Sequence, residues 1–305
     1  MKENLICAAV STNDVALLQH LHAKFDLLYC ARKLLNVAAF SGCLDTLIYL
    51  YDLKHPGCTA FAMDAAAKAG HLKIVKFLHL HRNEGCTTKA MDGAAKYGHV
   101  EVLKWLHANR TEGCTTLAMN NAAMNGHLQV VQWLHHNGHG CTEQAMQSAI
   151  RFGHLSVVQW LHIHRAEGCD ATTSLDSSMS SENAKAMIEW LCVNRSDIDP
   201  AAFLKRAAVR DQIDVMELLL DCFQVPWSSM LTFKSVRRGQ FQALRWIHSK
   251  YPAVFDGMDP AALALPALKG NMDLLTWLQK VAHVEIPSDL LELAKRRSRQ
   301  SSHAS

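Results

Sequence analysis

The chain has 305 residues, of which 49% are hydrophobic and 19% are charged, and its formal net charge is +3. This composition is too apolar for a disordered chain, and so small a charge does not predict binding to nucleic acid. Its ten cysteines would suit a small secreted disulfide-bonded domain, but the apolar run Leu5–Val10 is too short for a signal-peptide core. No stretch approaches the roughly 18 apolar residues that a transmembrane helix needs. We therefore expect an intracellular protein, cytoplasmic or nuclear, with reduced thiols.

A short motif recurs about every 28 residues along the chain. Its clearest copies are Gly70-His71-Leu72, Gly98-His99-Val100, Gly126-His127-Leu128 and Gly153-His154-Leu155. A fixed period of this size is typical of stacked repeats that bury each other's apolar faces. Aligned on this glycine, ten repeats are centred on Asn13, Gly42, Gly70, Gly98, Gly126, Gly153, Asn183, Asp211, Gly239 and Gly270.

Each repeat has the pattern of two helices. In the best-kept copy the first helix should begin after Thr87, whose hydroxyl can cap free amides, and should end at Gly98. Small residues such as Ala94 and Ala95 permit close approach of neighbouring helices. The second helix has a wider apolar face, made by Val102, Leu103, Trp105 and Leu106. Thr59, Thr115 and Thr142 stand at the same position as Thr87. Because strand-like alternation is absent, we predict an all-α fold of about ten helix-turn-helix repeats.

The segment Ala94–Leu106 is similar to the A-A-x-x-G-H-x-x-V-V-x-L-L core of the ankyrin repeat family. The match recurs strongly from about residue 57 to 169. The family's T-P-L-H tetrapeptide is replaced, for example by Lys89-Ala90-Met91-Asp92, and the repeat is shorter than the usual length of about 33 residues. The missing residues fall between Arg110 and Thr115, where the family has its β-hairpin finger. The resemblance implies an ankyrin-like helical solenoid with fingers reduced or absent, similar to arrays in oomycetes and some large DNA viruses.

Three parts of one continuous solenoid are expected. Regular ankyrin-like repeats should occupy residues 1–170, degenerate repeats residues 171–286, and a C-terminal capping helix with a basic tail residues 287–305. The Ser-rich segment 172–181 is a candidate hinge, because serine competes with the helical backbone for hydrogen bonds.

Prolines mark helix boundaries in the degenerate part. Asp199-Pro200 and Asp259-Pro260 each place a capping residue before a first-turn proline, which predicts a helix start. Pro266 stands inside a first helix and should kink or shorten it.

Rows of cysteine and histidine suggest a metal-dependent or thiol-dependent enzyme as one alternative. The rows are Cys58, Cys86, Cys114, Cys141 and Cys169; His71, His99, His127 and His154; and His79, His107, His135 and His162. Packed helices lie about 8–10 Å apart, so one row cannot bring ligand atoms within the ~4 Å of one another that zinc requires. A mixed Cys–His site between repeats stays open.

A structural role for these rows is the interpretation that we favour. The cysteines would act as small apolar plugs, and the Leu-His histidines lie near the carbonyl end of the second helix, where a donor is favoured. The Gly-His histidines would bond the backbone of the adjacent repeat, as the ankyrin resemblance implies. A row of tryptophans should be packing residues. It comprises Trp105, Trp133, Trp160, Trp190, Trp246 and Trp277. We accordingly predict no catalytic residue, no metal ligand and no cofactor.

Positions that vary among otherwise similar repeats are free for binding. On the first helices they are Phe61, Lys89, Leu117 and Gln144; Lys68, Lys96, Met124 and Arg151; and Ala69, Tyr97, Asn125 and Phe152. In the ankyrin family the first helices line the concave surface. The predicted partner-binding residues are Lys68, Lys89, Lys96, Tyr97, Met124, Asn125, Arg151 and Phe152.

The ankyrin resemblance implies a non-catalytic protein-protein interaction scaffold, which we expect to be a monomer. Its partner would be a protein with acidic and apolar surface, not nucleic acid or a membrane. As an alternative, the chain is an adaptor or effector that engages its target through the degenerate C-terminal repeats. The basic run Lys295–Arg299 resembles a nuclear-import signal, and a solvated tail is the other interpretation.

Overall fold

The computed structural model describes residues 2–29, 33–167, 181–195, 200–209, 211–223 and 229–302. Within these ranges all elements are helical, with 20 α-helices, three short 3-10 helices and no strand. The all-α prediction is therefore confirmed. The chain divides into two compact units, Met1–Cys169 (unit 1) and Asp170–Ser305 (unit 2).

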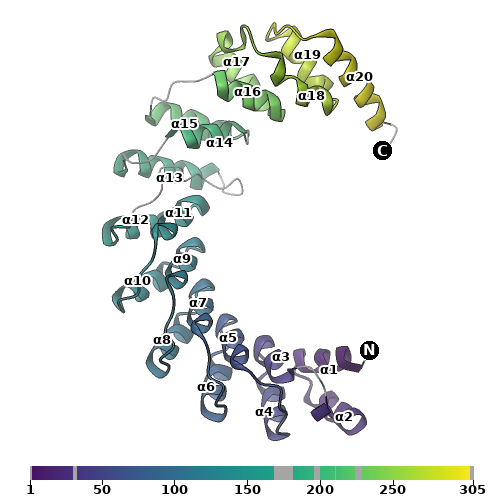
Figure 1. Cartoon of the computed structure of the whole chain (residues 1–305). Coiled ribbons are helices and arrows are strands. Elements are labelled where there is room, and N and C mark those ends of the chain that lie inside the picture. Colours follow the sequence, from purple (N-terminus) through teal and green to yellow (C-terminus); the bar gives the residue numbers. More distant parts are fainter. Residues whose placement is uncertain are drawn as a thin grey trace. The chain divides into compact units, whose positions relative to one another are not determined.

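Unit 1 alternates the first and second helices of successive repeats (Figure 1). Its elements are α1 (Lys2–Ser11), α2 (Val15–Phe25), the 3-10 helix η1 (Leu27–Tyr29), α3 (Leu34–Ser41), α4 (Leu44–Asp52), α5 (Ala60–Lys68), α6 (Leu72–His81), α7 (Thr88–Lys96), α8 (Val100–Asn109), α9 (Thr116–Met124), α10 (Leu128–His136), α11 (Glu143–Phe152) and α12 (Leu155–His164). The first helices α3, α5, α7, α9 and α11 pack side by side. In Figure 1 they lie on the inner side of the curve of unit 1, and the second helices lie on the outer side.

Small and branched side chains make the core between these helices. Ala94 and Ala95 of α7 are fully buried, and so are Leu103 and Leu106 of α8. Alanine allows the first helices to approach closely, and each buried leucine contributes about 1.5–3 kcal/mol through the hydrophobic effect. The alternation of a small-residue helix with a leucine-rich helix therefore explains why consecutive repeats stack in one register.

The capping threonines behave as predicted at three of the four positions. The hydroxyl of Thr87 accepts a hydrogen bond from the amide of Lys89 at 3.2 Å, and Thr115 and Thr142 make the equivalent bond. Thr59 is the exception, because it has no capping bond within its own helix.

The loops between repeats confirm the loss of the fingers. Residues 82–87 and 110–115 contain no strand. Each loop is held by an arginine and a glutamate two residues apart, in the pairs Arg82–Glu84, Arg110–Glu112 and Arg165–Glu167. A two-pronged guanidinium–carboxylate contact is enough to close a turn that is too short for a hairpin.

Unit 2 has the same alternation with less regular elements. They are α13 (Ser181–Asn194), α14 (Pro200–Val209), α15 (Ile213–Phe223), α16 (Ser229–Arg238), α17 (Phe241–Lys250), the 3-10 helices η2 (Pro252–Phe255) and η3 (Pro260–Ala262), α18 (Ala264–Leu268), α19 (Met272–Lys280) and α20 (Ser288–Ser302). The first helix α16 packs against α14 and α18, and α20 packs against α18.

Proline has the predicted effect in unit 2. The helix α18, which contains Pro266, is only five residues long. The carboxylate of Asp259 accepts a hydrogen bond from the amide of Ala261 at 2.8 Å, and η3 begins at Pro260. The helix α14 begins at Pro200. Asp199 and the candidate hinge at 172–180 lie outside the described residues.

Two features of unit 2 differ from the sequence-based expectation. Asn183 lies in the first turn of α13, so it is not the turn between two helices, and alignment by spacing alone misplaced that repeat. The basic run Lys295–Arg299 belongs to α20, which continues to Ser302. The run is therefore the last part of the closing helix and does not follow it as a tail.

Candidate interaction surface and the contacts between repeats

The histidine of each Gly-His motif lies over the glycine of the preceding repeat. A Cβ atom added to Gly126 would lie 2.6 Å from the ring of His154, so only glycine leaves room for the imidazole. His154 Nε2 donates to the carbonyl of Met124 at 2.9 Å, and His99 bonds the backbone of Lys68. For these two histidines the predicted bond to the adjacent repeat is confirmed. Burial lowers the pKa of both, which keeps the rings neutral.

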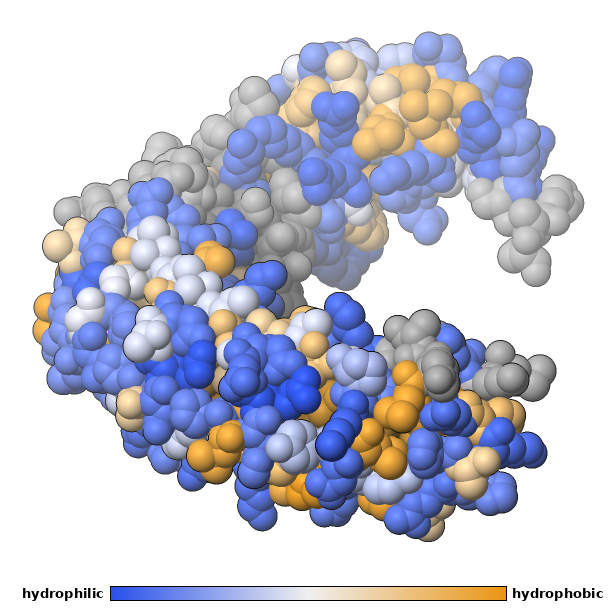
Figure 2. All heavy atoms as spheres, turned by 60° about the horizontal axis from the view of Figure 1, so that its bottom comes forward, coloured by the Kyte–Doolittle hydropathy of each residue, from blue (hydrophilic) through white to orange (hydrophobic). Residues whose placement is uncertain are grey.

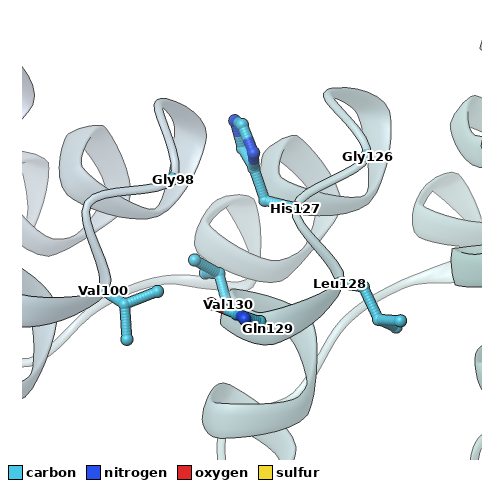
Figure 3. Close-up of a pocket in the computed structure, with 7 residues that line it drawn as sticks. All are labelled: Gly98, Val100, Gly126, His127, Leu128, Gln129 and Val130. Carbon is cyan, nitrogen blue, oxygen red and sulfur yellow. The ribbon is translucent and has the colours of Figure 1, made fainter.

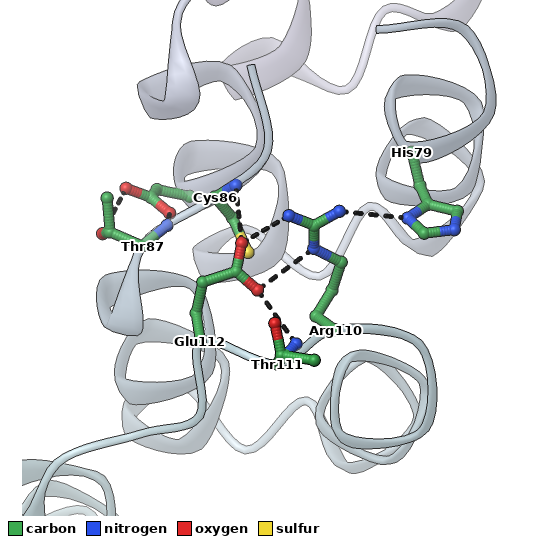
Figure 4. A network of polar contacts seen from close by, with 7 residues as sticks. His79, Cys86, Thr87, Arg110, Thr111 and Glu112 are labelled. Atoms are coloured by element: carbon green, nitrogen blue, oxygen red, sulfur yellow. Dashed lines mark hydrogen bonds and ion pairs between the residues drawn. The ribbon is translucent and has the colours of Figure 1, made fainter. Parts of the chain in front are cut away.

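A second contact joins each first helix to the next, and the sequence analysis missed it. Asp64 of α5 accepts hydrogen bonds from the amide and the hydroxyl of Thr87, both at 2.8 Å, and Figure 4 shows Thr87 in this contact. Asp92 binds Thr115 in the same way. The other copies of this Asx–Thr clamp are Asn36 with Thr59 and Asn120 with Thr142. Thr59 makes the clamp as Thr142 does, but unlike Thr142 it makes no capping bond within its own helix.

The Leu-His and tryptophan rows form one ladder of ring contacts. His79 meets Trp105 of the next repeat edge to face, with 5.1 Å between ring centroids. The equivalent pairs are His107–Trp133 at 5.2 Å, His135–Trp160 at 5.0 Å and, in unit 2, His248–Trp277 at 5.6 Å. Edge-to-face pairs of this kind contribute about 0.5–1.5 kcal/mol beyond their buried area. The two rows are therefore packing partners of one another.

The described members of the cysteine row lie in the loops, in contact with the next repeat, and they are Cys58, Cys86, Cys114 and Cys141. Cys169 lies outside the described residues. Figure 4 shows Arg110 between the thiol of Cys86, the carboxylate of Glu112 and the ring of His79. Burial raises the pKa of Cys86 to about 11. The hydrogen bond from Arg110 lowers the pKa of Glu112 to about 2. Because the thiolate is the reactive form of cysteine, the thiol of Cys86 is a poor nucleophile and serves packing.

One loop replaces this arginine with histidine. The sulfur of Cys114 lies 3.3 Å from Nδ1 of His139, and burial raises the pKa of Cys114 to about 11. Burial also lowers the pKa of His139, so a neutral ring accepts from a protonated thiol. Within the described ranges, no three Cys, His, Asp or Glu side chains are grouped so that they could hold a metal ion.

A small pocket opens between two turns of unit 1 (Figure 3). Its volume is about 290 Å³, and it is lined by Gly98, Val100, Gly126, His127, Leu128, Gln129 and Val130. Apart from His127 the lining has no titratable side chain, so the pocket lacks the paired acid, base or nucleophile that chemistry would require.

The predicted partner-binding residues lie on the first helices or directly after them. Lys68, Lys89, Tyr97, Asn125, Arg151 and Phe152 are exposed, whereas Lys96 and Met124 are half-buried. The structure brings three of them together. The ammonium groups of Lys68 and Lys96 lie 5.5 and 5.6 Å from the centroid of the Tyr97 ring.

Apolar side chains are exposed on the same helices. Phe61 of α5 is 58% exposed and Leu117 of α9 is 50% exposed. Phe40 of α3, which the sequence analysis missed, is 55% exposed. It occupies the repeat position of Lys68 and Lys96, and this equivalence is the signal that could have found it. Figure 2, which brings the lower edge of Figure 1 forward, shows mainly hydrophilic side chains on unit 1 with hydrophobic patches among them.

Comparisons with known proteins identify the repeats. A family model described as ankyrin repeats (many copies) matches residues 63–107 and 91–135, and one described as ankyrin repeats (3 copies) matches residues 119–203. No curated protein matches the sequence. The crystal structure of the human ASB11 ankyrin repeat domain is similar with a TM-score of 0.44 and 16% identity, over 73% of this chain and 99% of that chain.

The lengths of the helices and the family matches bear on membrane insertion and on the type of repeat. No helix in the described part of the chain is long and apolar enough to cross a membrane. Ankyrin repeats are generally modules of protein-protein interaction. The family models show that residues 63–203 of this chain are ankyrin repeats.

Proposed function

We propose that unit 1 is a non-catalytic recognition module that binds a protein partner on the surface of its first helices. The observation that carries the proposal is that the repeated and the variable side chains have different roles. Residues that repeat from one repeat to the next are used in contacts between repeats. Most of the residues that vary are exposed, on the first helices α3, α5, α7, α9 and α11 or directly after them.

The exposed set indicates the kind of partner. It contains aromatic and aliphatic side chains, which are common anchors in protein interfaces. They are Phe40, Phe61, Tyr97, Leu117 and Phe152. Among them lie the basic residues Lys68, Lys89, Lys96 and Arg151. A partner with acidic groups around apolar ones would complement this surface.

A catalytic role has less support. The described cysteines with a resolved shift all have a raised pKa, and their neighbours are repeated from loop to loop, whereas an active site needs one distinctive group of residues. We place the module in the cytoplasm or nucleus, because Cys43, Cys58, Cys86, Cys114 and Cys141 form no disulfide, as in a reducing compartment. We also expect it to act as a monomer.

The test is capture of partners from a cell extract with the full chain. Lys96→Glu combined with Arg151→Glu should reduce recovery of a specific partner about tenfold or more, because both charges would oppose an acidic surface. A matched control reverses Lys73 and Lys76, which are exposed on the second helix α6, and should recover the partner normally. If the Lys96/Arg151 variant keeps its thermal midpoint and still recovers the same partner, the proposed surface is wrong.

A further inference from the structure

Two first helices in the middle of unit 2 carry only basic charges, and the second helix between them in the chain carries only acidic ones. The first helices α14 and α16 contain basic residues but no Asp or Glu. The second helix between them in the chain, α15, contains Asp214, Glu217 and Asp221. A helix that is merely solvated usually mixes both signs, so the separation calls for a physical reason.

Four cations from the two first helices form what we call the basic cluster. They are Lys205 of α14 and Lys234, Arg237 and Arg238 of α16. The two helices pack against each other. Lys205, Arg237 and Arg238 are exposed and Lys234 is half-buried.

Like charges are held close together in the basic cluster. The neighbouring side chain of Lys205 lowers the pKa of Lys234, and desolvation adds to this effect. Across the described residues, the ion pairs of unit 2 involve other cations, such as Lys185 with Asp214 at 4.0 Å and Arg296 with Glu292 at 3.5 Å. Two adjacent ammonium groups without a counter-charge are unfavourable unless an anion is bound between them.

The helix dipole explains only part of this arrangement. Arg237 and Arg238 lie in the last turn of α16, where positive charge is favoured by the partial negative charge of the helix end. Lys205 and Lys234 lie in the middle of their helices, where the dipole gives no such benefit.

Lys205 also departs from the scaffold of the regular repeats. It stands six residues before the turn residue Asp211, as Asp64 does before Gly70 and Asp92 before Gly98. In those repeats the position accepts the two hydrogen bonds of the Asx–Thr clamp. An ammonium group has donors only, so Lys205 cannot serve as the acceptor of the clamp.

We propose that the basic cluster binds an acidic segment, a run of Asp and Glu residues, of a protein partner. Arginine binds carboxylates through two parallel hydrogen bonds, and the two lysines provide a compact focus of positive charge. A helix of ten residues is about 15 Å long, which suits a short peptide. Nucleic acid and membranes present negative charge over a wider surface and would also meet the carboxylates of α15, so they fit this cluster less well.

The test measures binding of a fluorescein-labelled oligoglutamate peptide to the full chain by fluorescence anisotropy. Titrations are done in the Lys96→Glu, Arg151→Glu background, so that the surface proposed for unit 1 does not compete. Adding Lys234→Glu and Arg237→Glu should weaken binding about tenfold or more. A matched control adds Lys250→Glu and Lys280→Glu, which are exposed on the second helices α17 and α19, and should change affinity by no more than about twofold.

Further measurements distinguish a loss of binding from a loss of folding and test other ligands. Circular dichroism must show that each variant is folded, and Arg237→Gln with Arg238→Gln is a milder variant that should also weaken binding. Equal affinity of folded cluster and control variants would overturn the proposal. Absence of peptide binding would also overturn it, as would tighter binding of single-stranded DNA or phosphatidylserine vesicles that is lost in the same variants. Because the background variant removes the proposed unit 1 surface, failure of that proposal leaves this result unaffected.

Discussion

Different side chains hold the turn between first and second helices in the regular repeats of unit 1 and around Asp211 of unit 2. In unit 1 the turn residue Gly98 has φ +77°, and the ring of His127 from the next repeat covers it. In unit 2 the turn residue is Asp211, with φ 61°, and its carboxylate accepts from the amides of Ala243 and Gln242. The left-handed turn is kept, but the group that binds the next repeat changes from a ring to a carboxylate.

The first repeat of unit 1 shows that a covering histidine ring and a side chain on the turn residue are alternative ways to hold this turn. Asn13 has φ 56° and accepts from the amide of Thr46 at 3.1 Å. The next repeat has Cys43, not histidine, after its turn glycine, and the repeat after Asp211 has Gln240 there. Asparagine and aspartate tolerate left-handed backbone better than other side chains. At Asn13 and Asp211, where the covering histidine is missing, the turn residue therefore provides a capping side chain of its own.

The largest effect is expected when a covered glycine receives a side chain. Gly98→Ala places a Cβ 2.8 Å from the ring of His127 and puts alanine at positive φ. We expect about 2–3 kcal/mol of destabilisation in urea unfolding, of which roughly 1–2 is the backbone term. Gly113→Ala is the matched control, because Gly113 also has positive φ but nothing lies within 4 Å of its Cβ. Equal losses in both variants would mean that the ring does not cover the glycine.

A smaller loss of stability is expected when the Asx–Thr clamp is removed. The clamp recurs in the described part of unit 1, whereas Lys205 of unit 2 cannot form it. Asp64→Ala removes the acceptor of two hydrogen bonds from Thr87, and we expect a loss of about 2 kcal/mol. Asp64→Asn should be nearly neutral, because the chain uses asparagine at the equivalent positions 36 and 120. Comparable losses in both variants, measured by urea unfolding, would argue against the clamp.

Acid should act on unit 1 through one buried histidine, His55, and four half-buried ones. Burial lowers the pKa of His55, His99, His135, His139 and His154 below the ordinary value of 6.5. A folded-state pKa below the unfolded one means that the unfolded chain binds protons first, so the stabilisation is complete above 6.5 and is lost as pH falls through the folded pKa. Urea midpoints should fall from pH 7.5 to pH 5.5, and His99→Gln should reduce this dependence. A flat profile would contradict neutral, partly buried rings.

The smallest effect is expected in the ring ladder, which both units share. Trp133→Phe keeps an aromatic edge for His107, and the chain itself uses Tyr51 and Phe77 as such a pair at 5.5 Å. We expect a loss below about 1 kcal/mol, with Trp133→Ala clearly larger. Thermal unfolding of the two variants measures the difference, and a phenylalanine variant as unstable as the alanine variant would show that the ladder needs the indole itself.

The sequence predicts well those features that depend on residues within a single repeat. Helix boundaries, the capping of Thr87 and Thr115, the left-handed Gly98 and the lost fingers all follow from local spacing. Pro266 shortens its helix for the same local reason. Asn183 was misplaced because its neighbours provide no glycine to anchor the alignment, and helix α13 runs through the expected turn.

Contacts between repeats were harder to predict, because they join different positions of neighbouring repeats. Asp64 and Asn120 make the same contact with a threonine of the next repeat, although they are different residue types. A search for identical residues at equivalent positions therefore does not reveal the clamp. The histidine and tryptophan rows were interpreted separately, although His79, His107 and His135 each pack on a tryptophan 25 or 26 residues later. The exposure of Phe40 depends on how its helix packs, which repeat spacing does not give.

The central claim is that side chains repeated along the chain hold neighbouring repeats together in one register. A double-mutant cycle of Gly98→Ala and His127→Ala, measured by urea unfolding of the full chain, tests it most directly. With the ring gone, the added methyl group should lose its clash, and the coupling energy should be about 1 kcal/mol or more. Strictly additive effects of the two substitutions would contradict the claim.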